Sequence, residues 1–219
     1  MILDDFNVEL ALWCGADKDA ADLARAVELV AEHKLPIVSV TPQVVPVVWP
    51  WLEKIKTKIM ARFYLSEGKI SENTISDTVK NINLTFKQGA NGAQVFLRYA
   101  DLSKVVDYLY IIKDDLFFDK DLSVGIDLGD VGPFDWNDLF FYLKKINAGS
   151  VLFVFTKDLG NKSDFVGRIY AMLNAWNKDN EFELHFAVGQ DVMRIEQVVR
   201  LVESMQSQLI KKLKFFVNF

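Results

Sequence analysis

Disulfides, an export signal and a membrane span are all missing from this 219-residue sequence. Its single cysteine, Cys14, excludes an internal disulfide and is typical of a reducing compartment. The first residues, MILDDFNVEL, are acidic and contain no basic cluster, unlike a secretory signal peptide. The longest continuously apolar stretch without a charge covers residues 44–52, far short of the roughly 20 residues that a membrane span requires. These absences predict a cytoplasmic protein with no membrane partner.

Motifs that mark metal, nucleotide or serine-hydrolase chemistry are absent as well. The sequence has no H-x-H, H-E-x-x-H or C-x-x-C spacing, no P-loop and no serine-hydrolase elbow. No G-x-G-x-x-G follows the first apolar run, where Gly15 stands alone. A net charge of −5 and a pI of about 5.1 argue against nucleic acid as a partner. We therefore expect no metal, no cofactor and no nucleic-acid partner.

Short apolar runs rich in Val, Ile and Phe recur along the chain at a regular interval. Most are hydrophobic at nearly every position, as expected for parallel strands that are covered on both faces. Helical patterns lie between them; one such segment begins at the N-cap candidate Ser71 and ends at the C-cap candidate Gly89. The expected strands cover residues 8–15, 36–42, 58–65, 92–99, 122–129, 150–156, 182–189 and 212–219.

This alternation of strands and helices predicts an α/β protein, a single (β/α)8 TIM barrel domain over residues 1–219. An open Rossmann-type sheet is the alternative, disfavoured by the missing glycine fingerprint. The eighth expected strand ends the chain, so the usual final helix is lacking. One flank of the barrel would then be bare and would need a cover from the N-terminal segment or from a partner subunit. We therefore include a homo-oligomer among the expected states.

Polar residues at the C-terminal ends of the strands are the candidates for a site, because barrels of this type build their sites there. Arg62 and Arg98 each lie near the end of an apolar strand, on the third and fourth expected strands. A guanidinium at such a position is costly unless it pairs with an anion. The two arginines could hold a phosphate or carboxylate substrate. Alternatively, they could form ion pairs with Asp127 or Asp130 at the barrel mouth.

Three further strands offer groups that could take part in chemistry. Asp127 ends the fifth strand and could act as an acid or a base. His185 lies within the seventh strand on the same face as Glu183, and is either a proton-transfer group or a core histidine. Thr156 ends the sixth expected strand and could contact the substrate, and Lys157 follows it. Lys157 could form an imine if burial or a nearby cation lowers its pKa; otherwise it begins a solvated loop.

Four segments resemble the deoxyribose-phosphate aldolase branch of the class I aldolases, a family of (β/α)8 barrels. Residues 37–48 are similar to the second strand of that family and the turn after it, and residues 76–99 to its third helix and fourth strand. Residues 123–130 look like its fifth strand, where the family has a glutamate near Asp127. Residues 147–160 resemble its sixth strand, which ends in the Schiff-base lysine. The resemblance implies carbon–carbon lyase chemistry through an imine.

The catalytic positions of that family are not matched in this sequence. Aligning the sixth strand puts Val154 where the Schiff-base lysine stands, with Lys157 three residues further along. His185 falls at the family's lysine on the seventh strand, and Gln94 at its aspartate on the fourth. The aspartate of the first strand falls near Leu10. The resemblance therefore implies the fold more strongly than the aldolase machinery.

Two functions of different classes follow from these residues. The favoured one is an enzyme, a lyase or isomerase that acts on a small anionic carbonyl or phosphosugar-type compound at the C-terminal face of the barrel. Arg62 and Arg98 would hold the anion and Lys157 would form the imine. Asp127 or His185 would transfer protons. The alternative is a catalytically inactive aldolase-like barrel that binds a small molecule or has a regulatory role.

Overall fold

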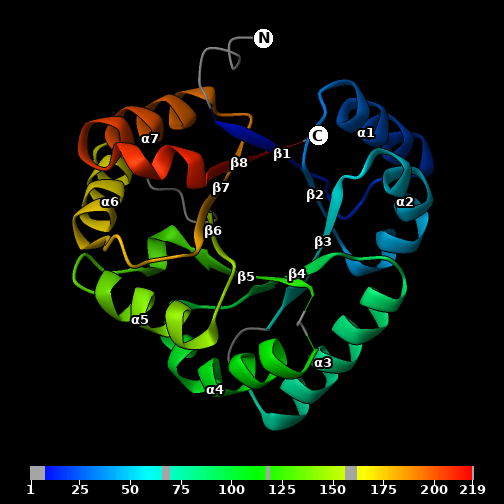
Figure 1. Ribbon diagram of the computed structural model, residues 1–219, viewed down its shortest axis with the longest axis horizontal. Helices are drawn as coiled ribbons and strands as arrows, with labels where there is room; N and C mark the ends of the chain where they lie inside the picture. Colours follow the sequence, from blue (N-terminus) through cyan, green and yellow to red (C-terminus); the bar gives the residue numbers. More distant parts are fainter. Residues whose placement is uncertain (1–7, 66–69, 117–118, 156–161, 219) are drawn as a thin grey trace.

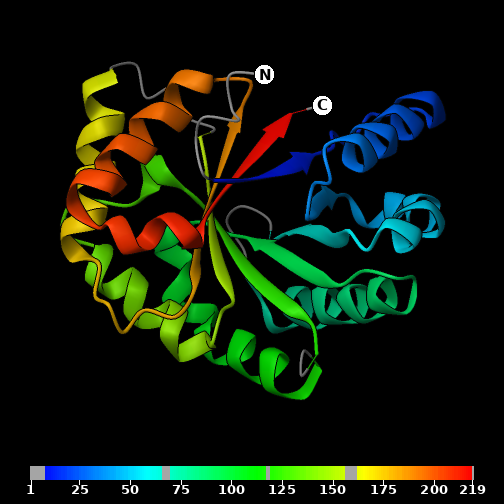
Figure 2. The same ribbon diagram turned by 45° about the horizontal axis from the view of Figure 1, so that its top comes forward.

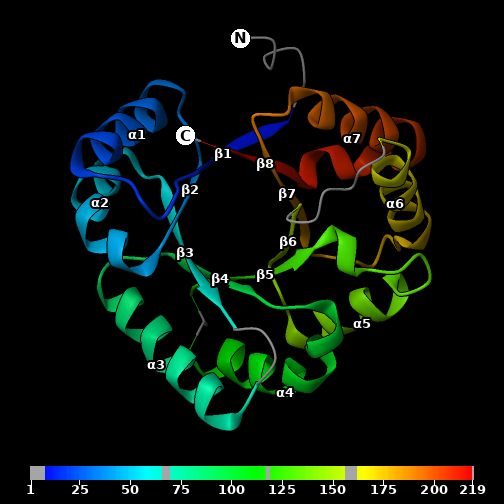
Figure 3. The same cartoon turned by 180° about the vertical axis from the view of Figure 1, so that it is seen from behind.

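The computed structural model of the protein describes residues 8–65, 70–116, 119–155 and 162–218. In these residues eight parallel strands form a closed barrel in the order β1 to β8, and β8 pairs with β1 to complete the ring. Helices α1 to α7 surround the strands, as Figures 1 and 3 show from opposite sides. The strands are tilted within the ring (Figure 2). The predicted (β/α)8 fold is confirmed.

Strands and helices alternate along the chain close to the predicted boundaries. The strands are β1 Glu9–Trp13, β2 Ile37–Val40, β3 Lys58–Tyr64, β4 Gly92–Phe96, β5 Asp121–Asp127, β6 Ser150–Val154, β7 Glu183–Gly189 and β8 Leu213–Asn218. The α-helices are α1 Ala20–Glu32, α2 Val45–Leu52, α3 Glu72–Lys87, α4 Tyr99–Leu116, α5 Trp136–Ile146, α6 Lys162–Ala175 and α7 Val192–Met205. A 3-10 helix, η5 Ser207–Lys212, connects α7 to β8.

Local signals in the sequence determine where α3 begins and ends. The hydroxyl of Ser71 accepts the backbone N–H of Thr74 at 3.2 Å and caps the helix, as predicted. The chain leaves the helix through Gly89, whose φ of 110° favours glycine. A Cβ atom at this position would also collide with the ring of Trp49 on α2. The glycine therefore allows α2 to pack against the end of α3.

Side chains alternate between the two faces of each strand, which divides the interior into two cores. Outward-facing side chains pack against the helices and form the larger core, which includes Trp136, Phe153 and Phe186. Inward-facing side chains fill the barrel lumen. The buried apolar members of this lumen core are Ala11, Ile37, Met60, Phe96, Leu152 and Phe216.

The flank of the barrel beside β8 is covered within the single chain. No helix follows β8 in the described residues, in agreement with the sequence. Nevertheless the outward-facing side chains of Leu213 and Phe215 are buried, and the Phe215 ring stacks on Phe186 with 5.8 Å between the ring centroids. These two side chains are thus buried without a partner subunit, and the homo-oligomer expected from the order of elements stays a prediction. The burial of a strand face depends on all its neighbours in the fold, which the order of elements alone does not reveal.

Replacing Phe215 with alanine should remove a large part of this packing. We expect Phe215→Ala to lower the free energy of unfolding by about 3–5 kcal/mol, as is usual for a fully buried phenylalanine. Urea unfolding followed by circular dichroism would measure the loss. Phe134→Ala is the control, because Phe134 is 93% exposed and its removal should change stability by less than about 0.5 kcal/mol. Equal stability of Phe215→Ala and the wild type would contradict the burial of this flank.

Candidate functional site

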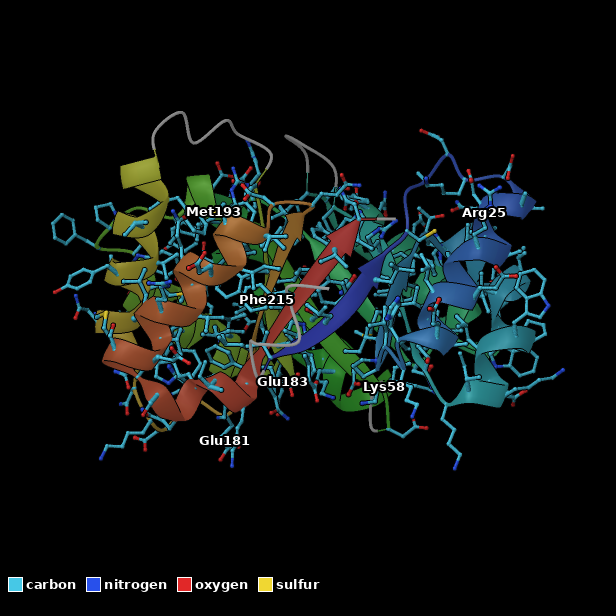
Figure 4. All side chains as sticks on the ribbon, turned by 90° about the horizontal axis from the view of Figure 1, so that it is seen from above. Arg25, Lys58, Glu181, Glu183, Met193 and Phe215 are labelled. Atoms are coloured by element: carbon cyan, nitrogen blue, oxygen red, sulfur yellow. The ribbon has the colours of Figure 1, made fainter. Side chains whose placement is uncertain are left out.

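A pocket opens at the C-terminal ends of the strands. Its volume of about 410 Å³ is in the range of small-molecule sites. Figure 4 shows the barrel from the side, with Met193 of α7 near the end where the strands finish, and Lys58 and Glu183 at the opposite end. The described residues that line the pocket are Trp13, Tyr64, Phe96, Val154, Phe155, Ala187, Val188, Gly189, Arg194 and Asn218.

Aromatic rings form the floor of this pocket. The ring of Trp13 packs edge-on against Phe96 with 5.8 Å between the centroids, and Tyr64 stacks on Phe96 at 4.9 Å. Phe96 can extend across the lumen because its partner on β5 is Gly125, where a Cβ atom would collide with the phenyl ring. The floor therefore shields the side chains deeper in the lumen from the pocket.

Arg194, in the first turn of α7, is the charged side chain among the described lining residues. Its Nε lies 3.2 Å from the carboxylate of Asp191, and its guanidinium lies 4.9 Å from the ring centroid of Phe155. The ion pair and the cation–π contact hold the guanidinium at the pocket wall. The sequence prediction, which considered the ends of the strands, did not include this helical residue. The available signal was a basic side chain in the first turn of a helix, where the helix dipole favours acids.

Arg62 lies in the lumen beneath the aromatic floor and is 3% exposed. Its guanidinium donates to the backbone oxygen of Ser39 at 2.9 Å and to that of Cys14, and lies 4.2 Å from the ring centroid of Trp13. Burial lowers the pKa of this arginine. No carboxylate in the described part of the chain forms an ion pair with it. Backbone carbonyls and the indole ring therefore offset the cost of burying the guanidinium.

Arg98 lies just beyond β4 in a different environment. Its side chain is 51% exposed and binds one carboxylate oxygen of Asp101, near the start of α4, at 2.6 Å. Lys104 binds the other oxygen at 2.9 Å, and hydrogen bonds from Lys104 and Arg98 lower the pKa of Asp101. The structure thus seals Arg62 inside the lumen and leaves Arg98 at the surface. It does not bring the two arginines together around one ligand position.

Asp127 is the last residue of β5, at the start of the turn that follows it. Its carboxylate accepts the backbone N–H of Gly129 at 2.8 Å. The side chain is half-buried and is not among the described lining residues of the pocket. Thr156 and Lys157 lie outside the described residues, so the roles expected for them stay predictions.

His185 lies in the lumen near the start of β7, in contact with charged groups. Its Nε2 is 2.9 Å from a carboxylate oxygen of Glu183, which also accepts a hydrogen bond from Lys214 at 2.5 Å. Burial lowers the pKa of His185, so the ring is neutral at pH 7 and its Nε2 donates to the carboxylate. Burial acts to raise the pKa of Glu183, but the hydrogen bonds from His185 and Lys214 outweigh it and lower this pKa to about 2. The predicted common face of Glu183 and His185 is confirmed.

Four positions correspond to catalytic residues of the aldolase family in the resemblance, and Val154 is the one that lines the pocket among the described residues. Gln94 is fully buried in the lumen, where its side-chain oxygen accepts the hydroxyl of Ser39 at 2.5 Å. His185 is held by Glu183, and Leu10 packs against the outer core. None of the side chains at these four positions is a primary amine.

In the described part of the chain, no group of three His, Cys, Asp or Glu side chains is placed to hold a metal ion. Cys14 is buried, and burial raises the pKa of its thiol, so the reactive thiolate is disfavoured. None of the described helices is both long and apolar enough to cross a bilayer.

The ion pairs of Glu183 should make stability depend on pH. The pKa of Glu183 is lower in the folded protein than its ordinary value, so its stabilising contribution is present near neutral pH and is lost as the pH falls from about 5 to about 2. Glu183→Gln should therefore lower the free energy of unfolding by about 1–3 kcal/mol at pH 7, and by much less at pH 2. Urea unfolding at both pH values measures the difference.

The control for this prediction is Asp77→Asn. Asp77 pairs with Lys80 at the surface, where both side chains are more than 70% exposed, so its loss should change stability little at either pH. A loss in Glu183→Gln that is equally large at pH 7 and pH 2 would contradict the assigned role of the carboxylate.

Comparisons with known proteins agree with the fold. No protein-family model matches the sequence, and no curated protein matches it. Among solved structures, deoxyribose phosphate aldolase from Aeropyrum pernix has a TM-score of 0.73 at 12% identity, covering 97% of this chain and 86% of that chain. The YdjI aldolase from Escherichia coli K12 has a TM-score of 0.62 at 10% identity, covering 99% and 78%. At these identities the likeness shows the fold alone, and the chain is a (β/α)8 barrel of aldolase-like architecture.

Proposed function

We propose that this aldolase-like barrel binds a small anionic metabolite at its C-terminal face and forms no imine on β6. One observation carries the proposal: Val154 lines the pocket at the position that the resemblance assigns to the Schiff-base lysine. An imine requires a primary amine, and valine has none. Of the two functions expected from the sequence, we therefore favour the alternative, a binding protein, over the enzyme.

The chemical character of the described lining supports a binding role. Arg194 is its charged member, and a guanidinium suits a carboxylate or a phosphate. None of these lining residues is Asp, Glu, His, Lys or Cys, the side chains that most often transfer protons or attack a substrate. In this proposal Arg62 and His185 serve the hydrogen bonding of the lumen beneath the floor, and Arg98 stabilises the start of α4.

A second candidate is a lyase or isomerase that uses Lys157. The observation in its favour is that Val154 and Phe155, which directly precede Thr156 and Lys157, both line the pocket. In this candidate Lys157 forms the imine, Thr156 contacts the substrate and Asp127 transfers protons. A trapping experiment separates the two candidates.

Restoring a lysine at the family position should create the missing amine. Wild type and Val154→Lys are each treated with borohydride in the presence of small aldehydes and keto acids, and adducts are measured by intact mass and peptide mapping. We expect no adduct on the wild type, and an adduct at residue 154 of the variant. The apolar surroundings and the nearby cation Arg194 should lower the pKa of the new lysine and leave its amine free to attack.

Leu84→Lys is the control for the trapping experiment. Leu84 lies on the exposed surface of α3, where a new lysine keeps its ordinary charge and should not be labelled. An adduct at Lys157 of the wild type would overturn the proposal in favour of the second candidate.

The oligomeric state and the cytoplasmic location stay predictions from the sequence. The aldolase from Aeropyrum pernix is described as tetrameric. For this chain, the flank that suggested a homo-oligomer is covered by its own residues.

A further inference from the structure

Four of the described lining residues of the pocket are aromatic: Trp13, Tyr64, Phe96 and Phe155. Tyr64 is the last residue of β3 and is 61% exposed, although its ring stacks on Phe96 with only 22° between the ring planes. One face of the tyrosine ring is thus held by a fixed neighbour while the side chain as a whole stays accessible. Such an arrangement offers a flat surface on which another ring can stack.

The stacked rings of Tyr64 and Phe96 and the guanidinium of Arg194 lie on opposite sides of the pocket. Tyr64 and Phe96 end β3 and β4, which lie across the closed eight-strand ring from β7 and β8 (Figure 1). Arg194 follows β7, in the first turn of α7. A ligand that contacts both sides must therefore have a flat apolar part at one end and an anionic group at the other.

The described lining offers few partners for hydroxyl groups. Besides Tyr64 and Arg194, its polar side chains are the amide of Asn218 and the indole of Trp13. A sugar phosphate has several hydroxyls, and each one that loses water without gaining a partner weakens binding. The lining therefore disfavours a polyhydroxylated ligand.

We propose that the ligand of this pocket is a flat aromatic carboxylate rather than a sugar phosphate, an inference that rests on the binding function proposed above. The aromatic ring of the ligand lies against Tyr64 and Phe96, and its carboxylate accepts hydrogen bonds from Arg194. The pocket volume of about 410 Å³ is ample for a bicyclic acid.

Two acids of equal charge and the same carbon skeleton test the need for a flat ring. 2-Naphthoate is aromatic and planar, decahydro-2-naphthoate is saturated and puckered, and ribose 5-phosphate represents the sugar phosphates. Isothermal titration calorimetry on the full chain gives the three dissociation constants. We expect 2-naphthoate to bind about threefold to tenfold more tightly than its saturated analogue, as stacking of one aromatic pair implies, and more tightly than ribose 5-phosphate.

Variants assign the two ends of the ligand. Tyr64→Leu should weaken 2-naphthoate but not the saturated acid. Arg194→Gln should weaken both acids by about tenfold and leave the neutral analogue 2-naphthamide unchanged. Arg200→Gln is the matched control, because Arg200 lies on the same helix, is 75% exposed and pairs with Glu196. Circular dichroism and urea unfolding confirm that each variant is folded.

The outcomes separate this inference from the proposed function. Selective binding of 2-naphthoate that depends on both Tyr64 and Arg194 supports the aromatic carboxylate. Equal binding of the flat and saturated acids, or tighter binding of ribose 5-phosphate, overturns the aromatic class; if that binding still requires Arg194, the anion-binding function stands. Absence of binding by every compound of the panel overturns both.

Discussion

The ring of Phe96, which lies across the lumen beside Gly125, divides the barrel into two compartments. Above it is a pocket with aromatic walls and a guanidinium at its edge. Below it, Arg62 and Gln94 are almost fully buried, and both form hydrogen bonds with Ser39. Because of this division, an inward-facing side chain near the C-terminal end of its strand can reach a ligand in the pocket. A side chain nearer the N-terminal end cannot. Val154 lines the pocket, whereas the polar groups deeper in the lumen contact one another, the backbone and aromatic rings such as that of Trp13.

The lower compartment is an ionic and hydrogen-bonded plug. Lys58 and Asp121, on β3 and β5, form a half-exposed ion pair at 2.7 Å across the intervening β4. On β4, a Cβ atom at Gly92 would collide with the backbone oxygen of Asp121 and with the side chain of Met60. Glu183 and Lys214 form a second pair at 2.5 Å. Charges at this N-terminal end are distant from the pocket, and this end of such barrels generally serves stability rather than chemistry. The N-terminal end of the barrel is therefore held together by a set of interactions separate from those that line the pocket.

Much of the fold follows from the sequence because parallel strands covered on both faces leave a simple mark, a short run that is apolar throughout. The caps of α3 are equally local: Ser71 and Gly89 act through their own side chain or its absence. The cover over β8 could not be predicted in this way. The burial of Phe215 depends on contacts with residues from other parts of the chain, and the local sequence pattern does not predict those contacts.

The site is predicted less well than the fold, and for a geometric reason. Alternation along a strand correctly pairs Glu183 with His185, but it does not say how deep in the lumen they lie. Arg62 and Arg98 have similar positions in the sequence of their strands, yet one lies within β3 and the other beyond the end of β4. Arg194 comes from a helix, so its place in the pocket does not follow from the positions of the strand ends.

The pair formed by Phe96 and Gly125 also bears on how such a fold changes over time. The phenyl ring fits only because Gly125, its partner on β5, has no side chain. The depth of the pocket therefore depends on both residues. A lineage that exchanged the phenylalanine for a small residue would lower the floor toward the guanidinium of Arg62 without moving the backbone. The guanidinium would still lie against the ring of Trp13, so the deeper pocket would be lined by an indole and a cation together.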